Sequence, residues 1–334
     1  MKITIQDIAE KAEVSKMTVS RVLSGKGYVK KETAERIQNI ISDLNYEPNF
    51  IARSLSSKRS MILGVIIFKT APSIFDEYVA QVFSGIVDNS ELKHYRIMVL
   101  PVDPNQGYQN EYIKIARTNL LDGLILLRSR INDVKIEVLA KSGFPFVLVN
   151  FKKFSPYYNF VDTENIKGGI LAMEYLIKKG HKKIVFLSGN LYETNARDRF
   201  KAYQTTLSNH GLEYNEDWVV PTEFNEEDAY LKTEQLLKCP NRPTAIFCAS
   251  DYIAIGAMRR IKDMGFRIPD DIALVGYDDI ELASHIQPKL TTIRQPLHEL
   301  GKNAGQILLD IITGKRKTPV HKLLKIELIE RESC

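Results

Sequence analysis

The chain has few of the residues that build metal centres, disulfide frameworks and membrane spans. Its three cysteines are scattered over 334 residues without paired spacing, which argues against a zinc or disulfide site and favours free thiols in a reducing compartment. It has neither a signal peptide nor an apolar run long enough to cross a bilayer, so the sequence predicts a cytoplasmic protein without membrane contact.

Motifs of common enzyme classes are also missing. The chain contains no G-x-x-x-x-G-K-[ST], G-x-S-x-G, H-E-x-x-H or G-x-G-x-x-G. These motifs supply a phosphate-binding loop, a catalytic nucleophile or a pair of metal ligands. The six histidines are dispersed. We therefore expect no enzyme activity, no metal and no cofactor.

Positive charge is concentrated at the N-terminus. Hydrophobic residues make up 44% of the chain and charged residues 26%, as in ordinary globular proteins. Residues 1–60 hold eleven Lys and Arg against seven Asp and Glu, so they carry +4 of the formal net charge of +5. This balance places the charge where contact with phosphates would need it.

Residues 4–24 predict two short helices joined by a tight turn. Thr4 and Asp7 have the spacing of a capping box, and apolar residues recur behind them at helical intervals. Ser15 is a second N-cap, before a helix with a polar and basic outer face. A helix-turn-helix places the start of its second helix in the major groove of DNA. An ordinary helical hairpin with a solvated basic face is the alternative.

The second helix therefore supplies candidate DNA contacts. Arg21 suits a bidentate bond to guanine, and the hydroxyls and the helix N-terminus suit phosphates. The predicted contacts in this segment are Thr4, Ser15, Lys16, Met17, Thr18, Ser20 and Arg21.

A third helix, over 32–44, completes a small three-helix core in a headpiece of residues 1–45. Residues 46–60 follow as a hinge, in which Pro48 separates the third helix from a short apolar one capped by Asn49. A helix of about seven residues is marginal alone in water, so we expect this one to fold only against a partner.

Residues 1–60 resemble the headpiece and hinge of the lactose-repressor (LacI/GalR) family of bacterial transcription regulators. The resemblance rests on T-I-Q-D-I-A, V-S-x-x-T-V-S-R-V-L, L-N-Y-x-P-N and A-R-S-L, in the family's order and spacing. It implies that two hinge helices pair across a pseudo-palindromic DNA operator and that Leu55 wedges into the minor groove; Leu55 as a core residue of the headpiece is the alternative. The DNA contacts implied in the hinge are Asn49, Ala52, Arg53 and Leu55.

From Met61 onward strands and helices alternate. Continuous apolar runs at 61–68, 95–102, 122–128 and 144–150, and again at 182–189, 219–224, 244–250 and 272–279, are separated by amphipathic stretches. Buried runs of this kind predict parallel sheets with helices on both faces, in two α/β lobes.

The body, residues 61–334, resembles the family's periplasmic-binding-protein-like domain, which binds an effector and dimerises. The resemblance implies three chain crossings between lobes, near 160–163, 289–294 and 319–324. The N-lobe would then hold about 61–160 and 292–320, and the C-lobe about 162–290 and 322–334. Ligands of such sheets bind beyond the carboxyl ends of the strands.

Strand ends supply candidate contacts for a sugar-like effector. An arginine fork and carboxylates suit vicinal hydroxyls, and aromatic faces suit a sugar ring. Capping, pairing between lobes and core packing are the alternatives for each residue, and for Asp251 the alternative is an N-cap. The candidates are Phe75, Arg128, Ser129, Asp162, Arg199, Ser250, Asp251, Tyr252, Asp278 and Gln295.

The resemblance implies a homodimeric repressor whose operator binding is controlled by a small molecule between the lobes. The helix at 296–312 and the one near 78–92 are candidate dimer surfaces because of their apolar residues. A regulator that needs a corepressor, either a purine or a phosphorylated protein partner, is the alternative. Ser250 and the segment 69–78 depart from the family pattern of sugar binders, and Lys16-Met17 departs from its familiar reading pairs, so neither effector nor operator follows from the sequence.

Overall fold

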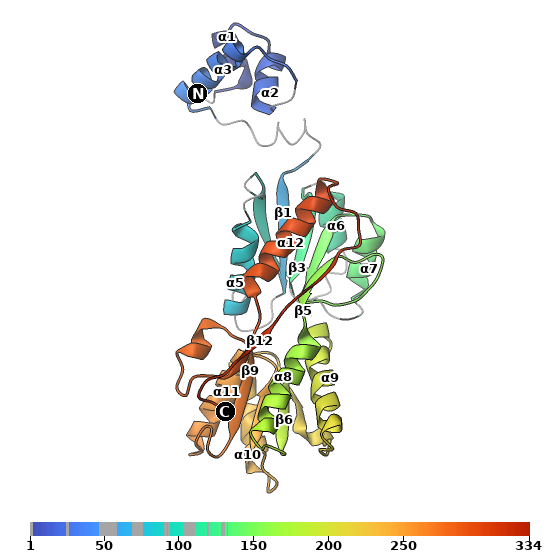
Figure 1. Cartoon of the computed structure of the whole chain (residues 1–334). Coiled ribbons are helices and arrows are strands. Elements are labelled where there is room, and N and C mark those ends of the chain that lie inside the picture. The colour runs from blue at the N-terminus through green and yellow to red at the C-terminus, as the bar shows by residue number, and fades with distance from the viewer. Residues whose placement is uncertain are drawn as a thin grey trace. The chain divides into compact units, whose positions relative to one another are not determined.

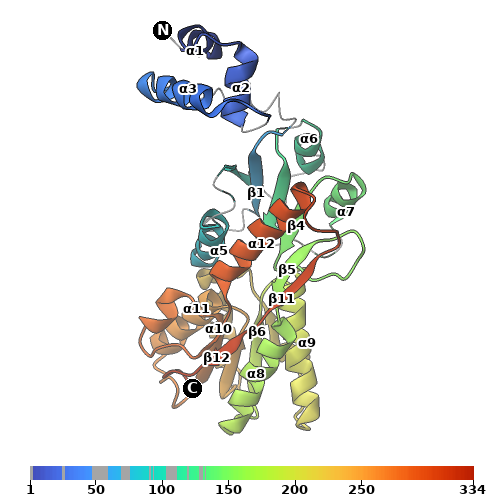
Figure 2. The ribbon, with the colours of Figure 1, turned by 45° about the horizontal axis from the view of Figure 1, so that its top comes forward.

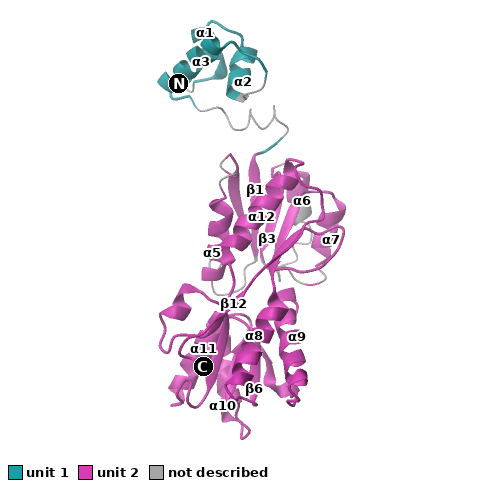
Figure 3. Cartoon of the chain, viewed as in Figure 1, with its two compact units in different colours: residues 1–60 teal, residues 61–334 magenta. Residues whose placement is uncertain are grey.

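The computed structural model describes residues 3–24, 27–46, 59–68, 76–89, 92, 94–102, 111–118, 120–127, 131 and 133–334. The chain divides into two compact units, Met1–Ser60 and Met61–Cys334 (Figure 3). Each is described by itself.

The first unit is a bundle of three helices, α1 (Ile5–Lys11), α2 (Lys16–Ser24) and α3 (Lys31–Asp43). The capping box predicted for α1 is confirmed, because the Thr4 side chain accepts from the Asp7 backbone and the Asp7 side chain accepts from Thr4 N at 2.7 Å. Asp7 Oδ2 also accepts a hydrogen bond from Thr4 Oγ1 at 2.8 Å. These bonds hold the pKa of Asp7 below its ordinary value. Ile8, Val19 and Ile37 are fully buried between the helices, so one residue from each helix forms the centre of this core.

The second unit contains two six-stranded sheets, with strand orders β11-β5-β4-β3-β1-β2 and β12-β10-β9-β8-β6-β7. All neighbouring strands are parallel except the antiparallel pair of β10 and β12. The elements of the first lobe are β1 (Ile62–Phe68), α5 (Glu77–Val87), β2 (Arg96–Val102), α6 (Glu111–Arg117), β3 (Gly123–Leu127), α7 (Val134–Lys141), β4 (Phe146–Val149), β5 (Phe160–Thr163), α12 (Leu297–Ile312) and β11 (His321–Leu324). Those of the second lobe are α8 (Asn165–Lys178), β6 (Ile184–Ser188), α9 (Thr194–Asn209), a short 3-10 helix (Glu216–Trp218), β7 (Val219–Pro221), α10 (Glu226–Lys238), β8 (Ala245–Cys248), α11 (Asp251–Asp263), β9 (Ala273–Asp278), a 3-10 helix (Glu281–Ser284), β10 (Thr292–Arg294) and β12 (Glu327–Ile329).

Helices cover both faces of each sheet (Figures 1 and 2). In the first lobe, Val65 of β1 packs in the cluster under α5 and α12, whereas its neighbour Ile66 packs in the cluster under α6 and α7. Successive side chains of a strand point to opposite faces, so a strand without polar positions is what two helical layers require. The predicted α/β class with parallel sheets is confirmed.

The chain crosses between the lobes three times, at slightly later positions than the sequence suggested. The crossings lie between β5 and α8, between β10 and α12, and between β11 and β12. Residues 292–294 therefore belong to the second lobe and residues 321–324 to the first, because β10 pairs with β9 and β11 pairs with β5. The helix α7 and the strands β5, β10, β11 and β12 were not expected from the sequence.

The apolar face of α12 is buried inside the first lobe. Glycines bring α12 and α5 into close contact: a Cβ at Gly301 would lie 1.8 Å from Val82 O, and one at Gly85 would lie 1.9 Å from His298 O. Leu300, Ala304 and Leu308 of α12 are fully buried. The apolar residues that suggested α12 as a dimer surface are thus used within the lobe, and a partner would meet only its polar side.

Candidate functional site

The outer face of α2 is polar and basic, as a DNA-reading helix requires. Ser15 caps the helix, because its Oγ accepts a hydrogen bond from Thr18 N at 3.1 Å. Met17 is 64% exposed while Val19, two residues on, is fully buried. Arg21 is exposed and its Nη2 contacts Met17 Sδ at 3.6 Å. The buried side of α2 therefore fixes its orientation and leaves Met17 and Arg21 on the exposed side.

The other predicted DNA contacts of the headpiece and hinge differ in exposure and in hydrogen bonding. Lys16 and Ser20 are exposed on α2, whereas Thr4 uses its amide and hydroxyl to cap α1. Tyr28, which the sequence analysis did not single out, is 86% exposed after α2. The hinge contacts Asn49, Ala52, Arg53 and Leu55 lie outside the described residues.

A small polar pocket with a volume of about 10 Å³ lies between the two lobes of the second unit. The first lobe contributes Tyr78 from α5 and Asn150 after β4, and the second contributes the rest. Of the predicted effector contacts, Arg199 and Asp278 line it. The lining residues are Tyr78, Asn150, Glu193, Asn195, Arg199, Phe224 and Asp278.

Arg199 is 1% exposed and firmly held. Asn165 Oδ1 accepts hydrogen bonds from its Nε at 3.0 Å and its Nη2 at 2.9 Å, and Ala249 O accepts one from its Nη1 at 2.5 Å. Its guanidinium lies 3.5 Å from the centre of the Tyr277 ring. These bonds use three of the five N–H groups of the guanidinium. Arg199 is therefore part of the fold as well as of the pocket wall.

Asp162 positions Arg199 indirectly. Its Oδ1 accepts hydrogen bonds from Thr163 N at 2.7 Å and Asn165 Nδ2 at 2.8 Å, and Asn165 in turn holds Arg199. Asp162 is fully buried and its Oδ2 has no hydrogen-bond partner. Burial raises the pKa of Asp162 to about 7, because a low-dielectric environment disfavours the charged form. Asp162 therefore holds Arg199 in place through Asn165 and does not line the pocket.

Three neighbouring candidates, Ser250, Asp251 and Tyr252, serve the fold. Ser250 is the N-cap of α11, since its Oγ accepts from Ile253 N at 3.3 Å, so Asp251 is not the cap. Asp251 accepts from Thr292 Oγ1 at 2.6 Å and from Ile280 N at 2.9 Å, and burial, with Asp278 nearby, raises its pKa to about 7. Tyr252 OH accepts from Glu77 N of the first lobe at 3.1 Å.

Gln295 joins the two lobes. Its Oε1 accepts from Thr163 Oγ1 and its Nε2 donates to Asp278 Oδ1, both at 2.6 Å. Gln295 therefore contacts Asp278, a residue of the pocket lining, but does not line the pocket itself. The remaining candidates, Phe75, Arg128 and Ser129, lie outside the described residues.

Asn150 is the clearest pocket residue that the sequence analysis missed. It follows β4 with a φ of 55°, and its Nδ2 donates to Tyr78 OH. Its Oδ1 is buried without a hydrogen-bond partner, which costs free energy unless a ligand donates to it. The signal was a polar residue at the end of an apolar run. Glu193 and Phe224 lie outside helices and strands, where periodicity carries no information, and Asn195 lies in the first turn of α9.

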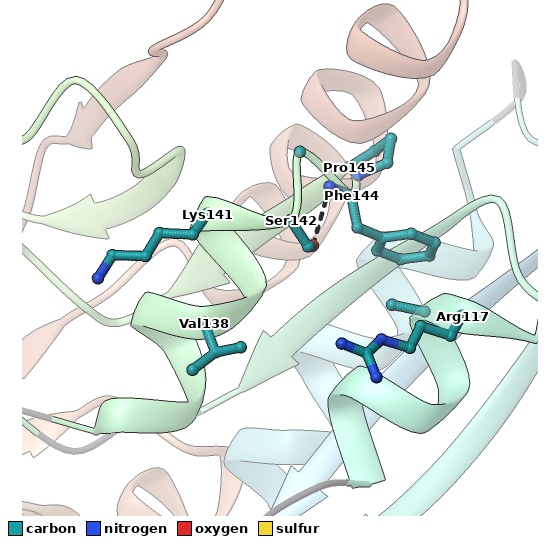
Figure 4. A pocket seen from close by; sticks show the side chains of 8 residues that line it. Arg117, Val138, Lys141, Ser142, Phe144 and Pro145 are labelled. Atoms are coloured by element: carbon teal, nitrogen blue, oxygen red, sulfur yellow. Dashed lines mark hydrogen bonds between the residues drawn. The ribbon is translucent and has the colours of Figure 1, made fainter.

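A second hollow lies between α6 and α7 on the first lobe (Figure 4). Arg117 and Lys141 flank it, and Val138 and Phe144 form its apolar part. Unlike the pocket between the lobes, it is lined by one lobe alone and its polar side chains are exposed. It therefore lacks the buried polar groups of a small-molecule site.

Within the described ranges, no group of three His, Cys, Asp or Glu side chains is arranged to hold a metal ion. In the same part of the chain, no helix combines the length and apolar character needed to cross a membrane.

Comparisons with known proteins agree with both units. Residues 4–49 match the family model described as bacterial regulatory proteins, lacI family, and residues 173–334 match the periplasmic binding protein-like domain. The HTH-type transcriptional repressor PurR of Photobacterium profundum is 32% identical over 99% of this chain and 98% of its own length. The ribose operon repressor of Haemophilus influenzae is 33% identical over 99% and 98%.

A solved structure covers the whole chain. The lac repressor dimer bound to operator and the anti-inducer ONPF has a TM-score of 0.86 and 28% identity, over 100% of this chain and 99% of that one. The resemblance seen in the headpiece motifs is thereby confirmed along the full length. The chain belongs to the lacI family of bacterial regulatory proteins and is a DNA-binding transcriptional regulator.

Proposed function

We propose that this regulator is a homodimeric, cytoplasmic repressor without enzyme activity, whose hold on its operator changes when a small polyhydroxylated molecule fills the pocket between the lobes. The observation that carries the proposal is the lining of that pocket by both lobes. A ligand that touches both lobes binds one lobe arrangement better than another, which is the requirement for allosteric control. Similarity to a repressor solved as a dimer supports the assembly.

The pocket chemistry supports a sugar-like effector. Asn150, Asn195 and Asp278 offer acceptors, Arg199 offers donors and Phe224 offers a ring face. Similarity to a ribose operon repressor makes a pentose the first probe. The ring of Phe224 equally suits a purine, so a corepressor of that class is the second candidate, and the sign of the effector's effect on operator affinity separates them.

The effector prediction is tested by calorimetry with D-ribose, beside a thermal-shift panel of sugars, sugar phosphates and nucleosides. D-ribose at about 100 times its Kd should stabilise the protein by roughly 2.7 kcal/mol. Asn150→Gly removes the pocket amide without straining the backbone φ of 55°. It should weaken binding about 2- to 10-fold, as expected for one hydrogen bond.

The control is Lys178→Ala, at the last residue of α8 and far in sequence from the lining residues. It should bind like the unchanged protein. If the panel's best ligand bound Asn150→Gly and the unchanged protein with the same affinity, the pocket between the lobes would be excluded as its site.

Direct readout by α2 is tested at Arg21. Arg21→Ala should weaken binding to an operator obtained by sequence enrichment by about 1 to 3 kcal/mol and relax the preference at one base pair per half-site. Fluorescence anisotropy on operator and random DNA measures both. Arg36→Ala, which removes another exposed arginine, on α3, is the control for charge alone. A loss at Arg21 that is equal on both DNAs would show a phosphate contact in place of base reading.

A further inference from the structure

The last residue of β9, Asp278, is followed by a second aspartate, Asp279, which has different partners. Asp278 has a φ of 125° and Asp279 a φ of 59°, both in the region that favours glycine, so the surrounding contacts must hold this backbone. Asp278 lines the pocket and accepts a hydrogen bond from Gln295. Asp279 instead forms ion pairs with two arginines. One strand end thus serves both the pocket and a separate charged cluster.

Asp279 joins the chain segments next to two of the lobe crossings. Its Oδ2 lies 2.6 Å from Arg294 Nε, directly before the second crossing, and its Oδ1 lies 2.6 Å from Arg331 Nη2, shortly after the third. The side chain of Asp279 is only 6% exposed. Arg294 Nη1 also lies 3.0 Å from Glu327 Oε1, at the start of β12. An ion pair with so little water around the carboxylate is screened less than a surface pair.

The first crossing is tied to the same place through side-chain and backbone bonds. Thr163, at the end of β5, donates to Gln295 Oε1, and Gln295 donates to Asp278. Glu164 N donates to Leu324 O at 3.1 Å, which joins the first crossing to the third. All three crossings are therefore connected to the Asp278–Asp279 pair within one or two contacts.

We propose that Asp279 is a positioning residue of the effector response, which clamps the three lobe crossings to the strand end that presents Asp278 to the effector. The inference rests on the proposed function, because it takes the pocket beside Asp278 as the effector site. Asp278 and Asp279 share a peptide bond, so a shift of Asp278 on effector binding moves the carboxylate that holds Arg294 and Arg331. The lobes then change their arrangement as the pocket fills.

The clamp is tested without effector by hydrogen–deuterium exchange of the full chain, comparing Asp279→Asn with the unchanged protein. Removing the charge should raise amide exchange at least tenfold at all three crossings, in residues 163–166, 294–297 and 324–328. Residues 163–166 do not touch Asp279, so faster exchange there would show that the loss of the Asp279 ion pairs affects a crossing that Asp279 does not contact. The control is Asp263→Asn, which removes an exposed carboxylate that accepts from Tyr230 in the same lobe; exchange at the crossings should stay unchanged.

The clamp is overturned if exchange rises only in residues that touch Asp279 directly, because the ion pairs would then be a local structural feature. If Asp279→Asn does not fold, Arg294→Lys, whose side chain is 48% exposed, keeps the charge but not the fork and decides the same question in the same peptides.

A second measurement adds D-ribose as the probe. It should slow exchange at the three crossings together in the unchanged protein, and only around the pocket in Asp279→Asn. Slowing at all three crossings in both proteins would contradict the clamp. Absence of ribose binding by the unchanged protein would count against a pentose effector, and the ribose-free comparison would still decide the role of Asp279.

Discussion

Replacing Arg199 with alanine is expected to lower the free energy of unfolding of the second unit by roughly 3–5 kcal/mol. The arginine is 1% exposed, and its removal leaves Asn165 Oδ1 and Ala249 O without the donors that now satisfy them. It also removes the cation that covers the Tyr277 ring and opens a cavity. Each effect alone costs one to several kcal/mol, and they act on the same site.

Urea unfolding followed by tryptophan fluorescence measures this loss, because the only tryptophan, Trp218, lies in the same lobe. Arg197→Ala is the matched control, because Arg197 lies two residues before Arg199 on α9 but has an exposed side chain. Surface changes of this kind stay within about 0.5 kcal/mol. Equal stability of the two variants would contradict this prediction, because the buried contacts of Arg199 would then contribute nothing to the free energy of unfolding.

This expectation differs from what the sequence alone suggests for Arg199. As an effector contact at a strand end, its removal should leave a folded dimer that binds operator and ignores effector. The structure shows that α9 turns Arg199 inward, where Asn165 and Tyr277 hold it. A binding assay on Arg199→Ala therefore mixes lost contact with lost stability, and Asn150→Gly is the cleaner probe.

Local patterns were sufficient for most of the fold. The headpiece helices begin where Thr4 and Ser15 cap them, and continuous apolar runs such as Gly123–Leu127 are fully buried strands. The strand β5 escaped because Phe160–Thr163 is short and half polar, and its place in the sheet depends on β11, some 160 residues later. Pairing between distant segments leaves no local periodicity.

The site was harder to predict for a related reason. Asp251 and Gln295 are at strand ends, as expected of ligand contacts, but each finds its partners inside the fold. Asn150 and Phe224 reach the pocket only because three crossings bring the lobes together. Residue type and strand end predict which side chains gather near the cleft; which of them face it depends on contacts between segments far apart in the chain.

Asp162 should make the stability of the protein fall as the pH rises. Burial raises its pKa from 3.8 to about 7, with Asp198, Arg199 and Lys152 as the charged groups near it. Between these two values the native state keeps a proton that the unfolded state has lost, so the free energy of unfolding decreases with rising pH in this window. The cost is absent below pH 3.8 and complete above about pH 7.

Asp162→Asn removes this titration while keeping an oxygen that accepts from Thr163 N and Asn165 Nδ2. The difference in unfolding free energy between variant and unchanged protein should therefore grow in the variant's favour by roughly 3 kcal/mol from pH 5 to pH 8, at about 1.4 kcal/mol per pH unit up to the native pKa. Urea unfolding at both pH values measures it. Asp251, whose pKa burial also raises to about 7, titrates in both proteins and cancels from the difference. A difference that does not change with pH would mean that Asp162 is already ionised in the native protein, held so by Arg199 of the second lobe and by Lys152, which follows β4 in the first lobe.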